Sequence, residues 1–278
     1  MHIRTMKIPV VIPARNEEKR LEKTILSIRE TAKFAGVEPY IVVVDDGSKD
    51  NTSAVAERLG CHVIRLKDRG YSALGRPELA DTHNAGFEHI KSQSDMPYEY
   101  LMVSGSDTSY ANDYLQILLE QMRKNEKLAM CSGVLDGFYT NPMAVRGSGR
   151  LIRRSFWESL GSRLPNDLYA WESYPVVAAN TGGFKTSTIY EARMQTDRPP
   201  LRSVDWKRYG IGMKENGSVL PYVILRGAKA AIQISPKAGF RLLLGYFSSV
   251  KNRYPLEMRQ FVSSYQKNRI LSFFGIKR

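Results

Sequence analysis

The chain has 278 residues, of which 42% are hydrophobic and 25% are charged, and its mean hydropathy is −0.35. This composition excludes a disordered or fibrous protein, and no apolar run reaches the roughly 18 residues that a membrane-spanning helix needs. The net charge of +13 favours a polyanionic partner: a nucleic acid, an anionic lipid surface or a phosphate-bearing substrate.

Cysteine content and the N-terminus indicate the compartment. Cys61 and Cys131 are too few for a disulfide framework, lack metal-ligand spacing and lie in apolar, strand-like segments. Buried thiols in a reducing compartment are therefore expected. The apolar stretch near the N-terminus is followed by charged residues and no small-residue cleavage site, which makes it a poor secretory signal. We expect a cytoplasmic protein, or one peripheral on the cytoplasmic face of a membrane.

Apolar, β-branched runs alternate with helical patterns through the first half of the chain. Strands are expected at 8–13, 40–44, 62–66, 98–103 and 128–135. Helices are expected at 17–34, 51–59, 77–91 and 111–124. Residues 136–235 have a mixed, loop-rich pattern, and the chain beyond residue 234 is helical in pattern. This order predicts a doubly wound α/β fold whose sheet is covered by helices on both faces.

In such sheets ligands bind beyond the carboxyl ends of the strands, here the loops after Ile12, Val44 and Val103. The second loop begins with two carboxylates, Asp45 and Asp46, which are costly after a buried strand unless they have partners. Asp46 can accept hydrogen bonds from a nucleobase and Asp45 can cap backbone amides, although an Asx-type turn explains the same residues.

The third loop, Ser104-Gly105-Ser106-Asp107-Thr108-Ser109, places one carboxylate among hydroxyl groups. Such a set can hold a divalent cation that bridges a diphosphate, because hard oxygen ligands suit Mg or Mn. Helix capping by Asp107 explains the loop equally well.

Taken together, the loops closely resemble family 2 glycosyltransferases of the GT-A fold group. The resemblance is carried by VVIPARNEEKRLEKTILSI, YIVVVDDGSKDNT, ELADTHNAG, YLMVSGSDTSY, GSGRLIRRSFWESLG and WESYPVVAANTGGFK. It covers about residues 6–230 and is strongest in the first hundred. It implies a GT-A-type, Rossmann-like, mostly parallel mixed sheet with helices on both faces plus C-terminal helices. We expect the catalytic domain to span residues 1–235 and a basic helical extension to span 236–278.

Carried over residue by residue, the resemblance implies a nucleotide-sugar site made of Pro13, Arg15, Glu17, Val44, Asp46, Ser106 and Asp107. Asp107 would also hold the metal, Mn or Mg. Gly105 stands where the family has the first carboxylate of its Asp-x-Asp segment. The expected metal affinity is therefore lower, and metal-independent chemistry stays open.

Sugar transfer from a nucleotide diphosphate needs a cation to offset the leaving charge, and a good nucleophile. Arg150, Arg153 and Arg154 are candidates for phosphate contacts, the alternative being a solvated strand edge. For a hydroxyl acceptor, Glu172 is the expected general base, with Asp167 as its substitute. A polyprenyl-phosphate-type acceptor is already ionised and needs no base.

The segment 236–278 carries a net charge of +8, and apolar residues recur in it at helical spacing. The pattern fits a helix that lies on an anionic membrane, and it fits equally a helix that packs on the catalytic domain. No RNA-recognition motif is present, so no nucleic-acid partner is expected.

The expected function is therefore a hexosyltransferase that moves a sugar from a UDP- or GDP-sugar to a glycan hydroxyl or a lipid phosphate. Inversion is usual in the resembled family. One alternative is a nucleotidyltransferase on a related sheet, against which the first strand lacks a Gly-rich, Lys-containing phosphate loop. The other is a non-catalytic protein that binds phosphate or nucleic acid.

Overall fold

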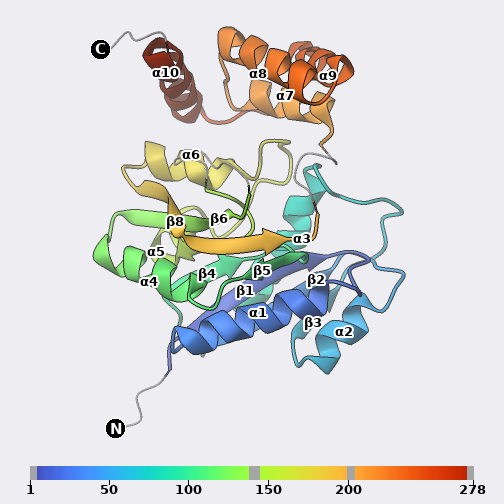
Figure 1. Ribbon diagram of the computed structural model, residues 1–278, viewed down its shortest axis with the longest axis vertical. Helices are drawn as coiled ribbons and strands as arrows, with labels where there is room; N and C mark the ends of the chain where they lie inside the picture. Colours follow the sequence, from blue (N-terminus) through green and yellow to red (C-terminus); the bar gives the residue numbers. More distant parts are fainter. Residues whose placement is uncertain (1–4, 138–144, 199–203, 274–278) are drawn as a thin grey trace. The chain divides into compact units, whose positions relative to one another are not determined.

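A computed structural model describes residues 5–137, 145–198 and 204–273 (Figure 1). Its strands are β1 (Lys7–Ala14), β2 (Glu38–Asp45), β3 (His62–Arg65), β4 (Tyr100–Val103), β5 (Thr108–Tyr110), β6 (Leu128–Leu135), β7 (Arg150–Arg153) and β8 (Lys185–Thr196). Its helices are α1 (Leu21–Phe34), α2 (Thr52–Arg58), α3 (Glu78–Ser92), α4 (Tyr114–Lys124), α5 (Arg154–Ser159), α6 (Tyr174–Thr181), α7 (Trp206–Glu215), α8 (Leu220–Gln233), α9 (Pro236–Phe247) and α10 (Leu256–Phe273).

The chain divides into two compact units. The first comprises Met1–Ser72, Asp81–Arg163 and Gly183–Pro199 and holds the sheet. The second comprises Ala73–Ala80, Leu164–Gly182 and Pro200–Arg278 and is helical. The predicted boundary at residue 235 falls between α8 and α9, which belong to the same unit.

The sheet of the first unit has eight strands in the order β3-β2-β1-β4-β7-β6-β8-β5 (Figure 1). The strands β3, β2, β1 and β4 are parallel, β7 runs antiparallel to β4 and β6, and β8 runs parallel to β6. The carboxyl ends of β1, β2, β3, β4, β6 and β8 therefore share one edge with the start of β7. We call this side of the sheet the carboxyl edge.

Both faces of the sheet are buried, which explains the continuous apolar runs in its central strands. On one face, Ile8 and Val10 of β1 join a core cluster with Ile25 and Ile28 of α1. On the other face, α3 approaches closely because it carries Gly86. A Cβ on that residue would lie 2.6 Å from Val11 Cγ1. The predicted layers are thus observed, with α1 and α3 on opposite faces of β1.

The largest difference from the predicted elements lies within residues 136–235. The pattern there is mixed and loop-rich, yet the segment contains β7, β8, α5, α6, α7 and α8. The twelve residues of β8 alternate irregularly in burial, and its pairing with β6 has two register shifts. These irregularities hide the period of two that identifies a strand in sequence.

In the second unit, α7, α8 and α9 pack through small residues. A Cβ on Gly210 of α7 would lie 2.0 Å from the carbonyl oxygen of Leu242, and one on Gly239 of α9 would lie 2.4 Å from that of Gly227. The helices touch along their backbones, so their cores need few large side chains. Within the described ranges, none of the helices combines the length and apolarity needed to cross a bilayer.

Candidate nucleotide-sugar site

Hydrogen bonds join the loops that follow β1 and β2 at the carboxyl edge. Arg15 donates to the carbonyl oxygen of Asp46, and its other terminal nitrogen lies 2.7 Å from Asp68 Oδ1. The backbone N–H of Asn16 donates to Ser48 Oγ at 2.9 Å, and the N–H of Lys49 donates back to Asn16 Oδ1 at 2.8 Å. The two loops therefore form one connected surface.

The paired aspartates after β2 have different partners. Asp45 accepts the backbone N–H of Ser48 at 2.8 Å and the hydroxyl of Ser53, as expected for a residue that caps the turn. Asp46 is 3% exposed, and its Oδ1 lies 2.5 Å from a terminal nitrogen of Arg69. A buried carboxylate with a cationic partner is a group that a base or ribose can also engage.

Gly47, which follows this pair, has no workable substitute. Its φ is +73°, in the left-handed region, and a Cβ there would lie 2.4 Å from Asp68 Cα. The close approach brings the segment after β3 against the loop after β2.

Glu17 is the most deeply placed carboxylate of the first loop. It is 3% exposed, its backbone N–H donates to Thr52 Oγ1 at 2.7 Å, and its carboxylate accepts from Arg198. Burial raises the pKa of Glu17, and the nearby Arg198 guanidinium only partly offsets that rise.

Asp107 lies in the third loop, just before β5. Its Oδ2 lies 3.7 Å from Nε of Arg198, so this guanidinium contacts both Asp107 and Glu17. Ser148 supports the loop by accepting the N–H of Gly105 at 2.9 Å and donating to Thr108 Oγ1 at 2.8 Å. The carboxylates of all three loops thus converge at the carboxyl edge.

A divalent cation at Asp107 needs several oxygen ligands. Asp107 offers one carboxylate and Gly105 offers no side-chain ligand. Across the described ranges, no group of three or more His, Cys, Asp and Glu side chains could hold a metal ion. The residues fit a cation that takes most of its ligands from a diphosphate and water, and they do not form a complete protein cage.

The other residues that are predicted to bind the nucleotide sugar lie in the same region. Pro13 and Val44 are register partners on β1 and β2, and Val44 is fully buried. Ser106 is buried, and its carbonyl oxygen accepts the hydroxyl of Thr24 at 3.0 Å. Val44 therefore supports the floor of the site.

The three candidate phosphate arginines are separated by the direction of β7. Arg150 pairs with Val103 at the carboxyl edge, where its guanidinium donates to the carbonyl oxygens of Val145 and Arg146. Arg153 pairs with Tyr100 at the opposite edge and donates to the carbonyl oxygen of Met122 at 2.5 Å.

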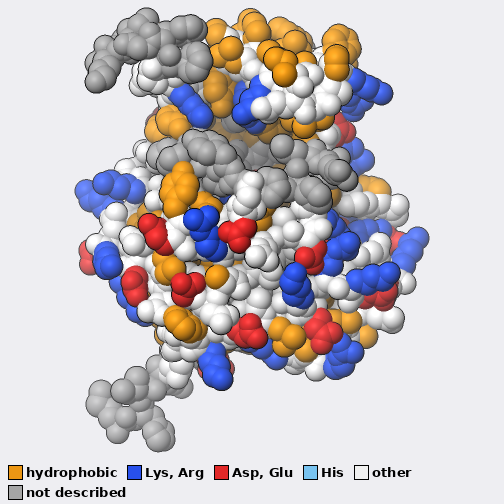
Figure 2. Space-filling view, viewed as in Figure 1, with side chains coloured by type: hydrophobic (Ala, Val, Ile, Leu, Met, Phe, Trp, Pro, Cys, Tyr) orange, Lys and Arg blue, Asp and Glu red, His pale blue; other side chains and the backbone are white. Residues whose placement is uncertain are grey.

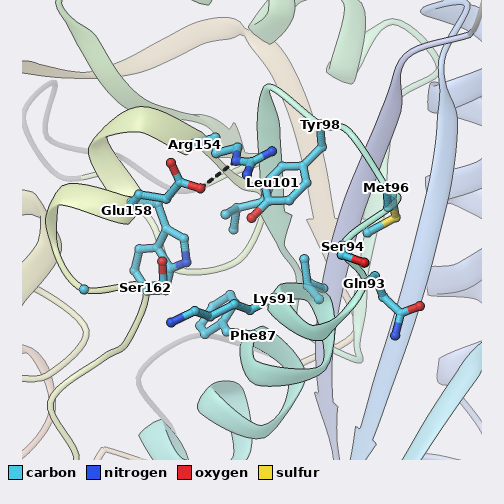
Figure 3. A pocket seen from close by; sticks show the side chains of 13 residues that line it. Phe87, Lys91, Gln93, Ser94, Met96, Tyr98, Leu101, Arg154, Glu158 and Ser162 are labelled. Atoms are coloured by element: carbon cyan, nitrogen blue, oxygen red, sulfur yellow. Dashed lines mark hydrogen bonds and ion pairs between the residues drawn. The ribbon is translucent and has the colours of Figure 1, made fainter.

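Arg154 lies beside Arg153 and lines a separate pocket of about 340 Å³ (Figure 3). It forms an ion pair with Glu158 at 2.7 Å and covers the ring of Tyr98 at 4.6 Å. The antiparallel course of β7 carries Arg153 and Arg154 away from the carboxyl edge. This placement favours the strand-edge alternative for Arg153 and Arg154 over the predicted phosphate contacts.

Glu172 and Asp167, the candidate bases, belong to the second unit. Both are exposed, and Glu172 lies in the turn before α6 and not within a helix. Glu215 anchors this turn, because its carboxylate accepts the N–H of Ala170 at 3.0 Å. Burial raises the pKa of Glu215, while hydrogen bonds from the turn oppose that rise.

Three residues at the carboxyl edge are not predicted from the sequence: Asp68, Arg69 and Arg198. Asp68 and Arg69 follow β3, and the rule that ligands bind beyond strand ends would have found them had it been applied to that strand. Arg198 follows β8, whose pattern does not indicate a strand, so no sequence signal identified it.

The sequence and the fold of the chain are similar to those of known proteins. Residues 10–188 match the sequence model of Glycosyl transferase family 2. The 4,4'-diaponeurosporenoate glycosyltransferase of Staphylococcus haemolyticus is 41% identical over 62 residues, which are 22% of this chain and 16% of that protein. The undecaprenyl-phosphate 4-deoxy-4-formamido-L-arabinose transferase of Enterobacter sp. is 33% identical over 92 residues, which are 30% and 25% of the two chains. The chain spans less than half the length of these curated relatives.

Solved structures share the fold at low identity. The mannosyltransferase PcManGT from Pyrobaculum calidifontis, in complex with GDP-Man and Mn²⁺, has a TM-score of 0.58 at 17% identity, covering 96% of this chain and 81% of that one. S. aureus TarS 1-349 in complex with UDP has a TM-score of 0.57 at 17% identity, covering 84% and 74%. These likenesses confirm the predicted GT-A-type fold class. With a family match over more than half of its length, the chain belongs to glycosyl transferase family 2.

Proposed function

We propose that this protein transfers a sugar from a UDP- or GDP-linked donor to a hydroxyl or lipid-phosphate acceptor, with inversion at the anomeric carbon. The observation that carries the proposal is the convergence of Glu17, Asp46 and Asp107 at one edge of the sheet, linked by Arg15 and Arg198. Membership of glycosyl transferase family 2 supports it, as do the nucleotide and nucleotide-sugar complexes of the similar structures.

In this proposal the base and ribose bind to the joined loops after β1 and β2. Asp46 and the segment beside Val44 contact the base, and Pro13, Arg15 and Glu17 line the ribose side. The carboxylate of Asp46 is held by Arg69, which fixes its orientation before the nucleotide arrives. Such preorganisation reduces the entropy lost on binding.

The diphosphate would lie beside Ser106 and Asp107. A divalent cation, Mn or Mg, would bind Asp107 and offset the charge of the leaving diphosphate. Arg198 supplies a second, built-in cation at the same carboxylate, and its guanidinium geometry suits phosphate oxygens. Arg150 supports this end of the sheet from within and is not expected to touch the donor.

The transfer step itself requires a nucleophile at the anomeric carbon. With a hydroxyl acceptor, Glu172 or Asp167 takes the hydroxyl proton, the acceptor oxygen bonds to the anomeric carbon, and the bond to the diphosphate oxygen breaks. The electron pair leaves with the nucleoside diphosphate. The family resemblance assigns this base, and the exposure of Glu172 in an anchored turn supports the assignment.

A lipid-phosphate acceptor would need no base. The name of the Enterobacter relative includes undecaprenyl phosphate, and residues 236–278 of this chain carry a net charge of +8. Both observations support an acceptor of the polyprenyl-phosphate type at an anionic membrane surface.

The proposal is tested by titration calorimetry with UDP, GDP and CDP, followed by incubation with UDP- and GDP-sugars in Mn²⁺ or in EDTA. We expect tight binding of UDP or GDP and slow release of the nucleoside diphosphate with free sugar. Formation of a nucleoside triphosphate and a sugar 1-phosphate when pyrophosphate is added to the same mixture would instead indicate a nucleotidyltransferase. Failure to bind any nucleoside diphosphate in either condition would overturn the donor site.

A further inference from the structure

Helices α8 and α9 expose large apolar side chains to solvent. Ile232 is 85% exposed, Phe240 66% and Phe247 65%. Figure 2 shows hydrophobic side chains gathered over both helices. We define the α8–α9 apolar face by six of them: Leu220, Ile224, Ile232, Phe240, Leu244 and Phe247. A contiguous exposed patch of this kind marks an interaction surface, whereas scattered exposed apolar residues do not.

The spacing of these residues is that of helix faces. Leu220, Ile224 and Ile232 recur at multiples of four along α8, and Phe240, Leu244 and Phe247 recur at four and three along α9. The buried sides of both helices carry mostly small residues. On α8 these are Val223, Gly227 and Ala230, and on α9 they are Ala238, Gly239, Leu242 and Gly245. The bundle therefore closes without the apolar face.

Cations flank this face. Residues 220–247 contain four Lys and Arg and no Asp or Glu. Lys229 and Lys237 are exposed, and neither forms an ion pair with any residue in the described ranges. The polar margin of the face is therefore positive.

A basic groove of about 660 Å³ in the same unit borders the face and shares Phe247 with it. Lys214, Arg253, Arg259 and Lys267 line this groove, and none of its lining residues in the described ranges is acidic. Positive charge therefore meets exposed aromatic surface at one place.

We propose that the α8–α9 apolar face docks on an anionic lipid membrane, with its side chains in the interface and the flanking cations on lipid phosphates. A membrane interface presents apolar chains beneath negative head groups, which matches an apolar face bordered by positive charge. A second copy of this chain would instead bring the same cations against one another, because a two-fold interface pairs a patch with itself. The surface includes α8, which lies before the segment 236–278 expected from the sequence.

The predicted amphipathic end of the chain is not part of this surface. Residues 274–278 of the expected amphipathic end lie outside the described residues. On α10, Met258 and Val262 are buried in a cluster with Leu168 and Val177. That side of α10 therefore packs within its own unit, as the packing alternative in the sequence analysis predicts.

Vesicle flotation of the full chain tests the proposal, with phosphatidylcholine vesicles that contain or lack phosphatidylglycerol. We expect flotation only with phosphatidylglycerol, and weaker flotation in high salt. Phe240→Glu and Ile232→Glu should each weaken binding at least about tenfold. Phe34→Glu is the matched control, because Phe34 is an exposed aromatic on α1 of the other unit. Lys229→Gln and Lys237→Gln should each cost about fivefold, and Lys124→Gln should cost nothing.

The proposal is overturned if the wild-type chain floats equally without phosphatidylglycerol, or if Phe240→Glu floats as well as Phe34→Glu. A dimer in sedimentation velocity that Phe240→Glu disrupts, with no vesicle binding, would show that a second copy covers the face. Flotation is measured without nucleotide, so it is independent of the proposed function. An unchanged thermal unfolding transition of Phe240→Glu in circular dichroism verifies that the variant is folded.

Discussion

The guanidinium of Arg198 lies 3.7 Å from the carboxylate of Asp107 and also contacts Glu17. Arg198 lies two residues beyond the end of β8, and β8 ends at the carboxyl edge because it runs parallel to β6. The chain therefore places a permanent positive charge beside the carboxylate of Asp107. In the proposed donor site, this charge would offset part of the diphosphate charge that a metal ion would otherwise offset.

Replacing Arg198 should make nucleotide binding depend more strongly on metal. We expect Arg198→Met to bind UDP or GDP about tenfold more weakly than wild type in EDTA, because a charge-assisted contact to phosphate is lost. Added Mn²⁺ should recover part of that loss. Titration calorimetry in the two conditions measures both effects. Arg193→Met, which removes an exposed β8 arginine that pairs with Asp136, is the control. Equal EDTA affinities for wild type and Arg198→Met would remove Arg198 from the donor site.

Asp46 should be essential for nucleotide binding. The isosteric substitution Asp46→Asn tests this more sharply than Asp46→Ala. Asp46→Ala would leave Arg69 without its 2.5 Å partner and so cost stability as well as affinity. Asp46→Asn keeps the shape and one acceptor oxygen, so we expect about a hundredfold weaker binding with a small change in melting temperature. Asp136→Asn, at an exposed carboxylate, should change neither quantity. Wild-type affinity in Asp46→Asn would contradict the assignment of this residue to the base.

The loops after β1, β2 and β4 are the part of the site that the local sequence pattern predicts. The strands β1, β2 and β4 are apolar runs that end in polar loops, so Glu17, Asp46 and Asp107 could be placed at one edge before any coordinates. Arg198 could not, because its position depends on β8 pairing with β6 through two register shifts. Long-range pairing of an irregular strand leaves no periodic signal in the residues themselves.

The arginines of β7 and of the adjoining α5 are a second case in which strand pairing decides what the sequence pattern cannot. Arg153 and Arg154 were grouped with Arg150 because they are close in sequence. A strand of four residues separates its two ends by about 10 Å, and an antiparallel strand presents its start, not its end, at the carboxyl edge. Only the strand direction, which tertiary pairing sets, decides that Arg150 is the member nearest the donor loops.

Glu17 should make stability depend on pH. Burial raises its folded-state pKa above the ordinary value of 4.5, so its stabilising contribution is complete below that value and is lost as pH rises through the folded pKa. Glu17→Gln removes this dependence. We therefore expect urea unfolding to show Glu17→Gln gaining stability relative to wild type as pH increases above 4.5. A constant difference between the two proteins from pH 4 to pH 8 would contradict the burial argument.

Glu172→Gln should separate the two classes of acceptor. With a hydroxyl acceptor, loss of the base should lower the turnover number by about a hundredfold or more while donor binding is unchanged. With a polyprenyl-phosphate acceptor, turnover should stay near wild type because the nucleophile is already ionised. Asp167→Asn tests the substitute base in the same assay, and Glu191→Gln controls for removing an exposed carboxylate. Unchanged turnover with every acceptor would exclude Glu172 from the transfer step.

Two helical glycines should respond in opposite ways to the same substitution. A Cβ on Gly86 of α3 would lie 2.6 Å from Val11 Cγ1 and 3.1 Å from Val44 Cγ2, beneath the donor loops. Gly86→Ala should therefore destabilise the fold by about 1–3 kcal/mol through overpacking, although alanine is the better helix former. A Cβ on Gly227 of α8 would meet its nearest neighbour outside its own helix, Leu243 Cγ, at 3.4 Å, an ordinary contact. Gly227→Ala should therefore gain up to about 1 kcal/mol of helix propensity.

Urea unfolding of the two variants provides the measurement, and nucleotide binding shows the consequence for the site. Because α3 supports β1 and β2 from below, we expect Gly86→Ala to weaken UDP or GDP binding by shifting the loops that follow these strands. Gly227→Ala lies in the other unit and should bind nucleotide as wild type does. If Gly86→Ala were as stable as wild type, α3 could move without cost, and close helix packing would not be what positions the donor loops.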